Sequence, residues 1–352
     1  MTKRIVAALL AFVTLILSAA AIAGCSDEEG GLFSSCDDAA NFPVTINGIT
    51  IEKRPKAIVC TSPKLTDILI EVGAAKSVIG RPYQYARADV SSAAEVGTND
   101  QPSLEIIMEL SADLIIVDEM IPAETLTALQ DTGIPVLQLQ TPCERLGFRN
   151  VYACIGAATG GARDGQNKGL AKAESILISL DDIQRLVSTS PVSYVCIFTN
   201  SALTTYVTGD DITSMCIELA GGFNVAVEGS RGNFSLNEAA KGDPDVILCP
   251  TGSQPTVRSK RVLNTCSAVT RNRIYDYDVS KFDTCGSDLI IATWELARVL
   301  HPEIVTLDMM PRDAIDYYAY TSPVMTEQEY ETMKSEEAEA SAEQTYVFTY
   351  ED

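Results

Sequence analysis

Few residues of this chain are of the types that catalysis needs. His301 is the one histidine among 352 residues, which removes histidine-based catalytic triads and multi-histidine metal sites. The sequence contains no Gly-Lys-Ser/Thr phosphate loop, no serine elbow and no His-Glu helix motif. His301 follows the apolar stretch 289–300 and precedes Pro302, a position where a cation meets the negative end of a helix. These patterns favour a structural role for His301 and a protein that binds rather than catalyses.

The N-terminus predicts export. Lys3 and Arg4 precede the apolar run 5–16 and the small residues 18–24, which together form a signal peptide over 1–24. The signal ends in Ile22-Ala23-Gly24-Cys25, which resembles the bacterial lipobox, and the resemblance implies that Cys25 is lipidated. Residues 25–41 are expected to hold that cysteine and a flexible tether. Because no later segment has ~18 consecutive apolar residues, the lipid is predicted to be the only membrane attachment, on the extracytoplasmic face.

Charge and cysteine content limit the partners. The formal charge of −22 makes nucleic acid an unsuitable partner. Nine of the ten cysteines remain after Cys25, and export permits disulfides, so one or two are predicted with the pairing left open. Cys60 and Cys249 end predicted strands, which leaves a thiolate metal site across a cleft as an alternative. No Cys-x-x-Cys occurs, which disfavours zinc and redox motifs, and no cofactor is predicted.

Strands and helices alternate along the rest of the chain. Asn47-Gly48 between two β-rich triplets predicts a hairpin. The strand 57–60 leads through Ser62-Pro63 into a helix, and 114–117 is an apolar strand typical of a buried parallel sheet. Helical periodicity over 147–186 breaks near 160, and its second part, 162–186, is expected to be a long connecting helix. The predicted class is α/β, with two lobes of mainly parallel sheets flanked by helices and joined by one long helix.

An internal repeat indicates that the lobes are related. Ser103-Leu104-Glu105 lies ten residues before the strand that follows Asp113, and Ser235-Leu236-Asn237 lies ten residues before the strand that follows Asp245. Each unit predicts a capped short helix that leads into a buried strand. The expected organisation is an N-terminal lobe over 42–146, connecting helices over 147–190, a C-terminal lobe over 191–310, and a helical segment with an acidic tail over 311–352.

Five motifs in this order resemble the substrate-binding proteins of ABC importers for iron siderophores, haem and cobalamin. They are 58–63 with Thr66-Asp67-Ile68-Leu69 and Val72-Gly73; Ser103-Leu104-Glu105 with Asp113-Leu114-Ile115; 219–224; 243–247; and 296–303. The resemblance implies two α/β lobes, an ABC permease as partner, and a small metal chelate bound between the lobes. The interpretation adopted is a lipid-anchored solute-binding protein without catalytic activity that captures a siderophore, haem or cobalamin. An exported structural or adhesive lipoprotein is the alternative.

The resemblance also suggests site residues. By their order along the chain, the ligand contacts are predicted to be Arg81, Tyr83, Tyr85, Tyr206 and Phe282, since aromatic faces suit planar chelates and arginine suits anions. In the resembled family a glutamate of each lobe docks onto the permease. Glu105 matches the first, whereas equal spacing places Asn237 at the second, with Glu238 one residue later. Glu105 and Glu238 are therefore the predicted docking residues, and the choice between Asn237 and Glu238 stays open.

Overall fold

The structure is a computed structural model that describes residues 41–306 and 309. It begins with an antiparallel hairpin of β1 (Val44–Ile46) and β2 (Ile49–Ile51). Asn47 and Gly48 turn with φ of 48° and 80°, the left-handed values that a two-residue hairpin loop requires, so the predicted hairpin is confirmed. The predicted signal peptide, Cys25, the tether and the segment 311–352 lie outside the described residues.

The first lobe is built on a five-stranded parallel sheet in the order β5-β4-β3-β6-β7. Its strands are β3 (Ile58–Cys60), β4 (Val78–Arg81), β5 (Ala94–Glu95), β6 (Leu114–Asp118) and β7 (Val136–Leu139). Its helices are α3 (Pro63–Glu71), α4 (Leu104–Glu109) and α5 (Ala123–Gln130), with 3-10 turns η1 (Ala75–Ser77) and η2 (Ala88–Val90). The connecting helices place the carboxyl ends of these strands on one edge of the sheet.

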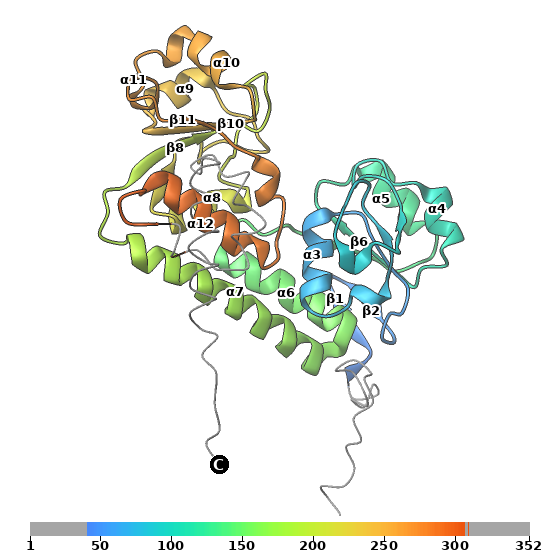
Figure 1. Cartoon of the computed structure of the whole chain (residues 1–352). Helices are drawn as coiled ribbons and strands as arrows, with labels where there is room; N and C mark the ends of the chain where they lie inside the picture. The colour runs from blue at the N-terminus through green and yellow to red at the C-terminus, as the bar shows by residue number, and fades with distance from the viewer. Residues whose placement is uncertain (1–40, 307–308, 310–352) are drawn as a thin grey trace, which may run out of the picture. The chain divides into compact units, whose positions relative to one another are not determined.

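The second lobe has a four-stranded parallel sheet in the order β11-β10-β8-β9. Its strands are β8 (Ser193–Ile197), β9 (Gly222–Asn224), β10 (Val246–Cys249) and β11 (Ile274–Asp276). Its helices are α8 (Ile212–Leu219), α9 (Leu236–Lys241), α10 (Gln254–Ser259), α11 (Ser267–Thr270) and α12 (Asp288–Leu300), with 3-10 turns η4 (Arg261–Leu263) and η5 (Val279–Phe282). Two lobes of parallel strands with flanking helices are the predicted fold class (Figure 1).

Alternate residues of each central strand enter different cores, because successive strand side chains point to opposite faces. In β6, Ile115 and Val117 pack with residues of α4 and α5, whereas Leu114 and Ile116 join a larger cluster. That larger cluster also takes in Val195 and Ile197 of β8 together with α3, α6, α7, α8 and α12. A single apolar core therefore runs from one lobe into the other.

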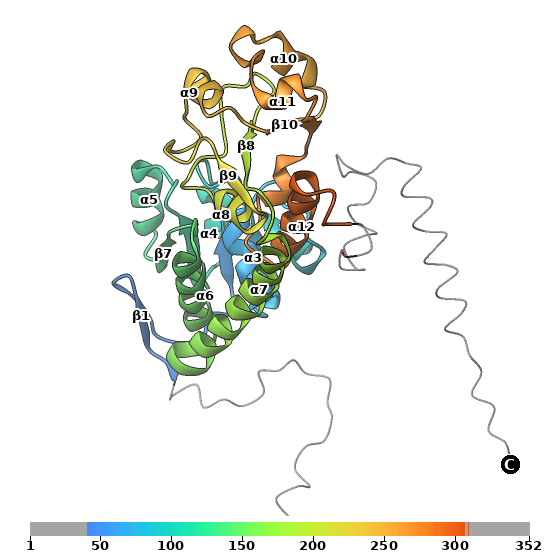
Figure 2. The ribbon, with the colours of Figure 1, turned by 90° about the vertical axis from the view of Figure 1, so that its left-hand side faces the viewer.

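The connection between the lobes is a helical pair. Helix α6 (Arg145–Gly160) and helix α7 (Gln166–Val187) flank a π-helical turn, Gly161–Gly165. Figures 1 and 2 show α6 and α7 side by side, joined at the end beside β1. A Cβ atom on Gly169 would lie 2.1 Å from the Tyr152 carbonyl oxygen, so only glycine permits this approach. Helix α7 is the long connecting helix that the sequence predicts.

Both repeated units have a short helix that leads into a buried strand, but only the first helix has the predicted side-chain cap, from Ser103, whereas Ser235 forms none. The Asp113 carboxylate accepts hydrogen bonds from the N–H groups of Lys56 (2.8 Å) and Ala57 (3.0 Å), which precede β3. The Asp245 carboxylate accepts one from the Tyr194 N–H (3.1 Å) at the start of β8. In each lobe an aspartate before one strand therefore holds the amino end of the neighbouring strand.

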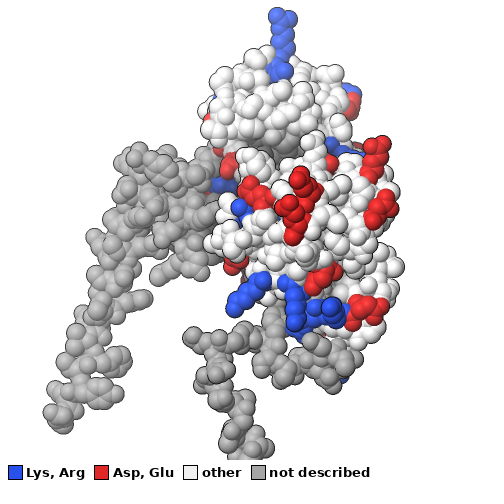
Figure 3. Space-filling model, turned by 90° about the vertical axis from the view of Figure 1, so that its right-hand side faces the viewer, with Lys and Arg blue, Asp and Glu red and all other residues white. Residues whose placement is uncertain are grey.

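Charge is unevenly distributed on the surface. Figure 3 shows Asp and Glu side chains over the middle of one face and a group of Lys and Arg side chains low on the same face. Because the whole chain carries 26 basic and 48 acidic residues, a basic group is the unusual feature.

Candidate functional site

A cavity of about 600 Å³ is lined by residues of both lobes. The first lobe contributes Lys64, Glu119, Met120, Gln140, Thr141, Pro142 and Cys143. The second contributes Thr199, Thr205, Tyr206, Thr208, Asp210, Asp211, Ile212, Ser230, Arg231 and Gly232. Most of these residues follow β6, β7, β8 or β9, the carboxyl ends where open α/β sheets bind ligands. The volume lies in the range of small-molecule sites.

The wall formed by the second lobe is organised around Asp210. Its carboxylate accepts hydrogen bonds from the Thr208 hydroxyl (2.6 Å), the Ser230 hydroxyl (2.9 Å) and the Arg231 backbone N–H (2.8 Å). Burial alone would raise the pKa of Asp210, but these hydrogen bonds outweigh it and hold that pKa below its ordinary value. An ionised Asp210 therefore joins the loop after β8 to the loop after β9.

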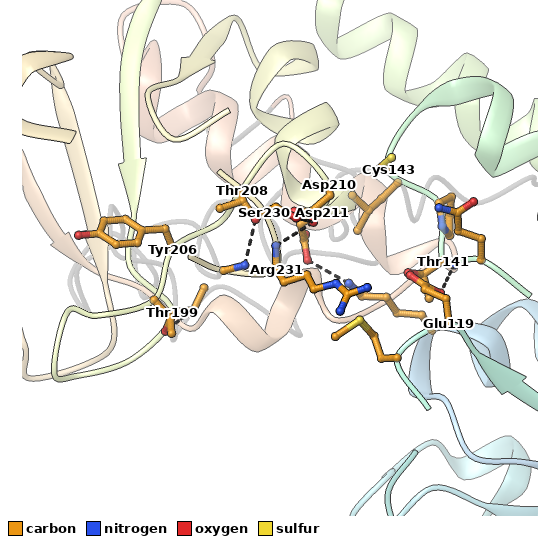
Figure 4. A pocket seen from close by; sticks show the side chains of 17 residues that line it. Glu119, Thr141, Cys143, Thr199, Tyr206, Thr208, Asp210, Asp211, Ser230 and Arg231 are labelled. Atoms are coloured by element: carbon orange, nitrogen blue, oxygen red, sulfur yellow. Dashed lines mark hydrogen bonds and ion pairs between the residues drawn. The ribbon is translucent and has the colours of Figure 1, made fainter. Parts of the chain in front are cut away.

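Arg231 is held in an unusual backbone conformation at this wall. Its φ is 51°, and Gly232 follows with a φ of 73°, although the left-handed region costs a residue with a Cβ about 1–2 kcal/mol. Figure 4 shows the Arg231 side chain extending from the second lobe toward the wall that Glu119 and Thr141 form. No described carboxylate forms an ion pair with the Arg231 guanidinium, so its hydrogen-bond donors are available to a ligand.

Two braced carboxylates shape the wall of the first lobe. Glu119 accepts hydrogen bonds from the Thr141 N–H (2.7 Å) and the Thr141 hydroxyl (2.6 Å), which join the loops after β6 and β7. Behind it, the buried Asp118 accepts from the Asn99 amide (2.5 Å) and the Met120 N–H (2.9 Å). Burial raises the pKa of Asp118, and its hydrogen bonds only partly offset that effect. This wall is therefore fixed before any ligand arrives.

Lys64 links the two lobes inside the cavity. It lies in the first turn of α3, and its Nζ is 3.2 Å from Asp211 Oδ2 and 3.9 Å from Asp283 Oδ1 of the second lobe. Burial would lower the pKa of Lys64, but the neighbouring Asp211 outweighs it, so the pKa is raised. Asp211 also caps α8 through the Thr213 N–H at 2.8 Å. The lysine is therefore a charged tie between α3 and the start of α8.

Of the five predicted ligand contacts, Tyr206 lines this cavity. Tyr206 is 3% exposed, and its ring packs against Phe198 and Phe234. Its aromatic face is therefore covered by the apolar core of the second lobe and is not open to the cavity. Phe282 is buried beside Tyr277, outside the cavity lining. Its role as a ligand contact stays a prediction.

The three predicted contacts at and just after the end of β4 lie elsewhere in the first lobe. Arg81 forms an ion pair with Glu95 (2.9 Å) and donates to the Tyr85 carbonyl oxygen (2.8 Å). The Tyr85 hydroxyl donates to the Asp67 carboxylate, and Tyr83 is exposed at the surface. Arg81 and Tyr85 are thus brought together, but by lobe-internal contacts.

Sequence reasoning missed Lys64 and Arg231. Lys64 follows Ser62-Pro63 at a predicted strand-to-helix turn, and such turns face the ligand edge of an α/β sheet. This signal was available. Arg231 lies in Ser230-Arg231-Gly232, and nothing in that segment reveals that Asp210 positions it.

The predicted docking residues are surface residues at equivalent helix starts. Glu105 is exposed in the first turn of α4, where the Ser103 hydroxyl caps the helix. Glu238 is exposed in α9 and forms an ion pair with Lys241 at 2.6 Å, while Asn237 is exposed beside it. Their docking role stays a prediction.

The prediction of disulfides is wrong for the described residues, in which all eight cysteines are free. Six are buried in apolar packing and two are half-buried, and burial raises the pKa of Cys60 and Cys249 to about 12. Thiols that resist ionisation are poor metal ligands. Residues 41–306 and 309 contain no group of three His, Cys, Asp or Glu side chains placed to hold a metal ion.

His301 ends α12, with its Nε2 3.3 Å from the Gly221 carbonyl oxygen.

The structure thus has two parallel-sheet lobes with a polar cavity at the carboxyl ends of their strands. Residues 58–280 match the family model described as periplasmic binding protein, and the chain belongs to this family. It is 27% identical over 311 residues to the "Uncharacterized ABC transporter substrate-binding lipoprotein YvrC" of Bacillus subtilis (strain 168), covering 83% of this chain and 96% of the relative.

Solved structures share the fold at lower identity. The periplasmic haem-binding protein RhuT of Roseiflexus sp. RS-1 has a TM-score of 0.59 and 19% identity, covering 70% of this chain and 98% of its own. The vitamin B12 binding protein BtuF of Vibrio cholerae has a TM-score of 0.59 and 15% identity, with coverages of 70% and 97%. The molybdate-binding protein MolA of Haemophilus influenzae has a TM-score of 0.59 and 17% identity, with coverages of 78% and 95%.

The chain therefore belongs to a family of non-catalytic solute-binding proteins. This result favours the solute-binding interpretation over a structural or adhesive lipoprotein. Among the described residues, no helix has the length and apolar character to cross a membrane.

Proposed function

We propose that this lipoprotein captures a metal chelate outside the cytoplasmic membrane and delivers it to an ABC permease. The sequence resemblance leaves siderophore, haem and cobalamin as candidates. We propose a ferric siderophore that carries anionic oxygen groups. The observation that carries this choice is the Arg231 guanidinium, which extends into the cavity without a described ion-pair partner.

The remaining lining supports a polar ligand. Six lining residues carry hydroxyl groups: Thr141, Thr199, Thr205, Tyr206, Thr208 and Ser230. The Thr141, Thr208 and Ser230 hydroxyls already donate to Glu119 or Asp210, so they offer a ligand oxygen lone pairs only. Tyr206 is the one aromatic side chain among the described lining residues, and its ring is buried. A flat apolar macrocycle would find little aromatic surface here, whereas carboxylate or catecholate oxygens would find charge-assisted hydrogen bonds.

The solved relatives support the fold but do not select the ligand. They include proteins that bind haem, vitamin B12 and molybdate, at similar TM-scores. The same scaffold therefore serves chemically different solutes, and the lining residues must decide among them.

Calorimetric titration of the purified protein with ferric siderophores, haemin and cyanocobalamin tests the ligand class. We expect saturable binding to be tightest for an anionic ferric siderophore, and mass spectrometry of the protein as purified should detect such a chelate. Saturable binding of haemin or cobalamin alone would replace the siderophore. No saturable binding of any candidate would overturn the proposed transport of a metal chelate.

We also propose that Cys25 carries the lipid that holds the protein on the outer face of the membrane. The support is the complete signal with its lipobox and a relative whose name includes lipoprotein. Cys25→Ala should release the protein or leave its precursor unprocessed, as followed by membrane fractionation. Unchanged processing and attachment would contradict lipidation.

A further inference from the structure

The described chain begins at a basic surface. The segments 52–56 and 161–168 contain five basic residues, Lys53, Arg54, Lys56, Arg163 and Lys168, against the two acidic residues Glu52 and Asp164. We call this set the entry patch. Its formal charge of +3, five minus two, contrasts with the −22 of the whole chain.

Contacts with Asn41 and the hairpin register bring these two segments together. The Asn41 amide donates to Asp164 Oδ2 (3.0 Å), and the Asp164 N–H donates back to Asn41 Oδ1 (3.2 Å). The hairpin register pairs Val44 with Ile51, so Glu52 leaves the hairpin next to Pro43, and further along the segment the Lys56 N–H donates to the Asp113 carboxylate (2.8 Å). Both halves of the entry patch therefore flank the point where the chain enters the fold.

Asn41 is tightly packed at the point where the described chain begins. Asn41 is 4% exposed, and a Cβ atom on Gly161 would lie 2.3 Å from the Asn41 Cβ. Asn41, the first described residue, therefore lies next to the entry patch. Lys53, Lys56, Arg163 and Lys168 are exposed, and Figure 3 shows basic side chains gathered low on one face, the end where Figure 1 places β1 and the α6–α7 turn.

We propose that the entry patch binds the anionic phospholipid surface to which the protein is tethered. This inference rests on the proposed lipid at Cys25, which lies 16 residues before Asn41 and so keeps the patch within about 55 Å of the bilayer. Each Lys or Arg near an anionic leaflet contributes about 1 kcal/mol, within a Debye length of about 8 Å.

The entry patch shares no residue with the cavity lining or with Glu105 and Glu238. The patch therefore uses residues separate from the ligand site and from the predicted docking residues. The patch would hold the protein close to the bilayer between encounters with the permease.

Vesicle co-sedimentation of the mature chain, residues 25–352 with Cys25→Ser, tests this directly, because it does not depend on lipidation. We expect binding to phosphatidylglycerol-containing vesicles, weak binding to pure phosphatidylcholine vesicles, and at least a tenfold loss between roughly 20 and 300 mM salt. Lys53→Glu with Arg163→Glu should weaken binding at least tenfold. The matched control, Lys260→Glu with Arg261→Glu in the second lobe, should bind as the unmodified chain does.

Three results would overturn the proposal. The first is equal binding to neutral and anionic vesicles. The second is unchanged binding of the Lys53→Glu, Arg163→Glu variant. The third is binding to free poly(glycerol phosphate) but to neither vesicle, which would assign the patch to another polyanion. Failure of Cys25 processing in cells would contradict the lipid anchor and not these results.

Discussion

The carboxylate of Asp67 on α3 accepts a hydrogen bond from the backbone N–H of Cys285, 218 residues later, at 3.3 Å. One turn along α3, Glu71 accepts from the Ser287 N–H (2.7 Å) and pairs with Lys172 of α7 (2.8 Å). Cys285 and Ser287 lead into α12, which packs on α7 and α8 of the second lobe. Two carboxylates of the first lobe therefore hold the start of the last described helix, and they connect the lobes in addition to Lys64 and the helical pair.

The two carboxylates should give opposite pH dependences. Burial raises the pKa of Asp67 by more than its hydrogen bonds lower it. For Glu71 burial also acts upward, but the hydrogen bonds from Lys172 and Ser287 outweigh it, so its pKa is lowered. Asp67 therefore stabilises the fold more below its unfolded pKa, and this contribution is lost as pH rises through its folded pKa. The contribution of Glu71 is present above its unfolded pKa and is lost as pH falls through its folded pKa.

Urea unfolding of Asp67→Asn and Glu71→Gln between roughly pH 3 and pH 7 measures this difference. Relative to the unmodified protein, the deficit of Asp67→Asn should shrink as pH rises, while that of Glu71→Gln should grow. Parallel changes in the two variants would contradict the opposite pKa directions.

Replacing Lys64 should loosen the contact between the lobes. Lys64→Met retains much of the buried stem but leaves Asp211 without its partner, so the free energy of unfolding should fall by about 1–3 kcal/mol. Urea denaturation measures this change. Lys241→Met provides a control, because its ion pair with Glu238 is exposed and should contribute at most about 1 kcal/mol. An equal loss of unfolding free energy in both variants would show that the ion pair of Lys64 stabilises the protein no more than an exposed ion pair does.

Replacing Arg231 should lower ligand affinity without lowering the stability of the fold. Arg231→Gly removes the guanidinium but suits the left-handed φ of 51°, so the free energy of unfolding should stay within about 1 kcal/mol. Affinity for the anionic chelate should fall about ten- to hundredfold, as measured by calorimetry. Arg231→Lys should recover part of it. Unchanged affinity in Arg231→Gly would remove this residue from the ligand site.

Docking to the permease should depend on Glu105. Glu105→Ala is expected to lower chelate uptake by cells while leaving the affinity of the purified protein intact, because Glu105 lies outside the cavity lining. Glu238→Ala should act more mildly, since Lys241 already pairs with that carboxylate, and Asn237→Glu should preserve or increase uptake. Uptake at the unmodified rate in Glu105→Ala, or loss of chelate binding itself, would contradict the docking role.

Thiol labelling should distinguish two of the eight described cysteines. Cys143 and Cys154 are half-buried and the other six are buried, while burial raises the pKa of both half-buried thiols. Maleimide should therefore modify Cys143 and Cys154 slowly in the folded protein and faster as pH rises. Mass spectrometry after labelling in denaturant should then show all eight modified. Protection of any described cysteine in denaturant without reductant would indicate a disulfide.

The helices and strands could be predicted from the sequence because the signals for them are local. The Asn47-Gly48 turn, the apolar run at 114–117 and the break near Gly160 each depend on a few neighbouring residues, and the structure has an element at each place. The family motifs then supplied the lobe arrangement, which local patterns do not contain.

The cavity residues depend on contacts between distant segments, which explains why most were missed. Arg231 is positioned by Asp210, 21 residues earlier, and Lys64 is oriented by Asp211, 147 residues later. The Tyr85 hydroxyl donates to Asp67, 18 residues earlier, a contact that local sequence does not reveal, and its role as a ligand contact stays a prediction. Residue type therefore identified suitable chemistry, whereas only the packing showed which side chains remained available for it.

The matching roles of Asp113 and Asp245 bear on how such a protein could acquire a new solute. Each aspartate fixes the amino edge of its sheet, while the cavity is formed by loops at the opposite, carboxyl edge. Folding and recognition thus depend on separate ends of the same strands. Loops such as 119–120 and 230–232 could be exchanged without disturbing either aspartate, so divergence or design can retarget the protein while both lobes keep their architecture.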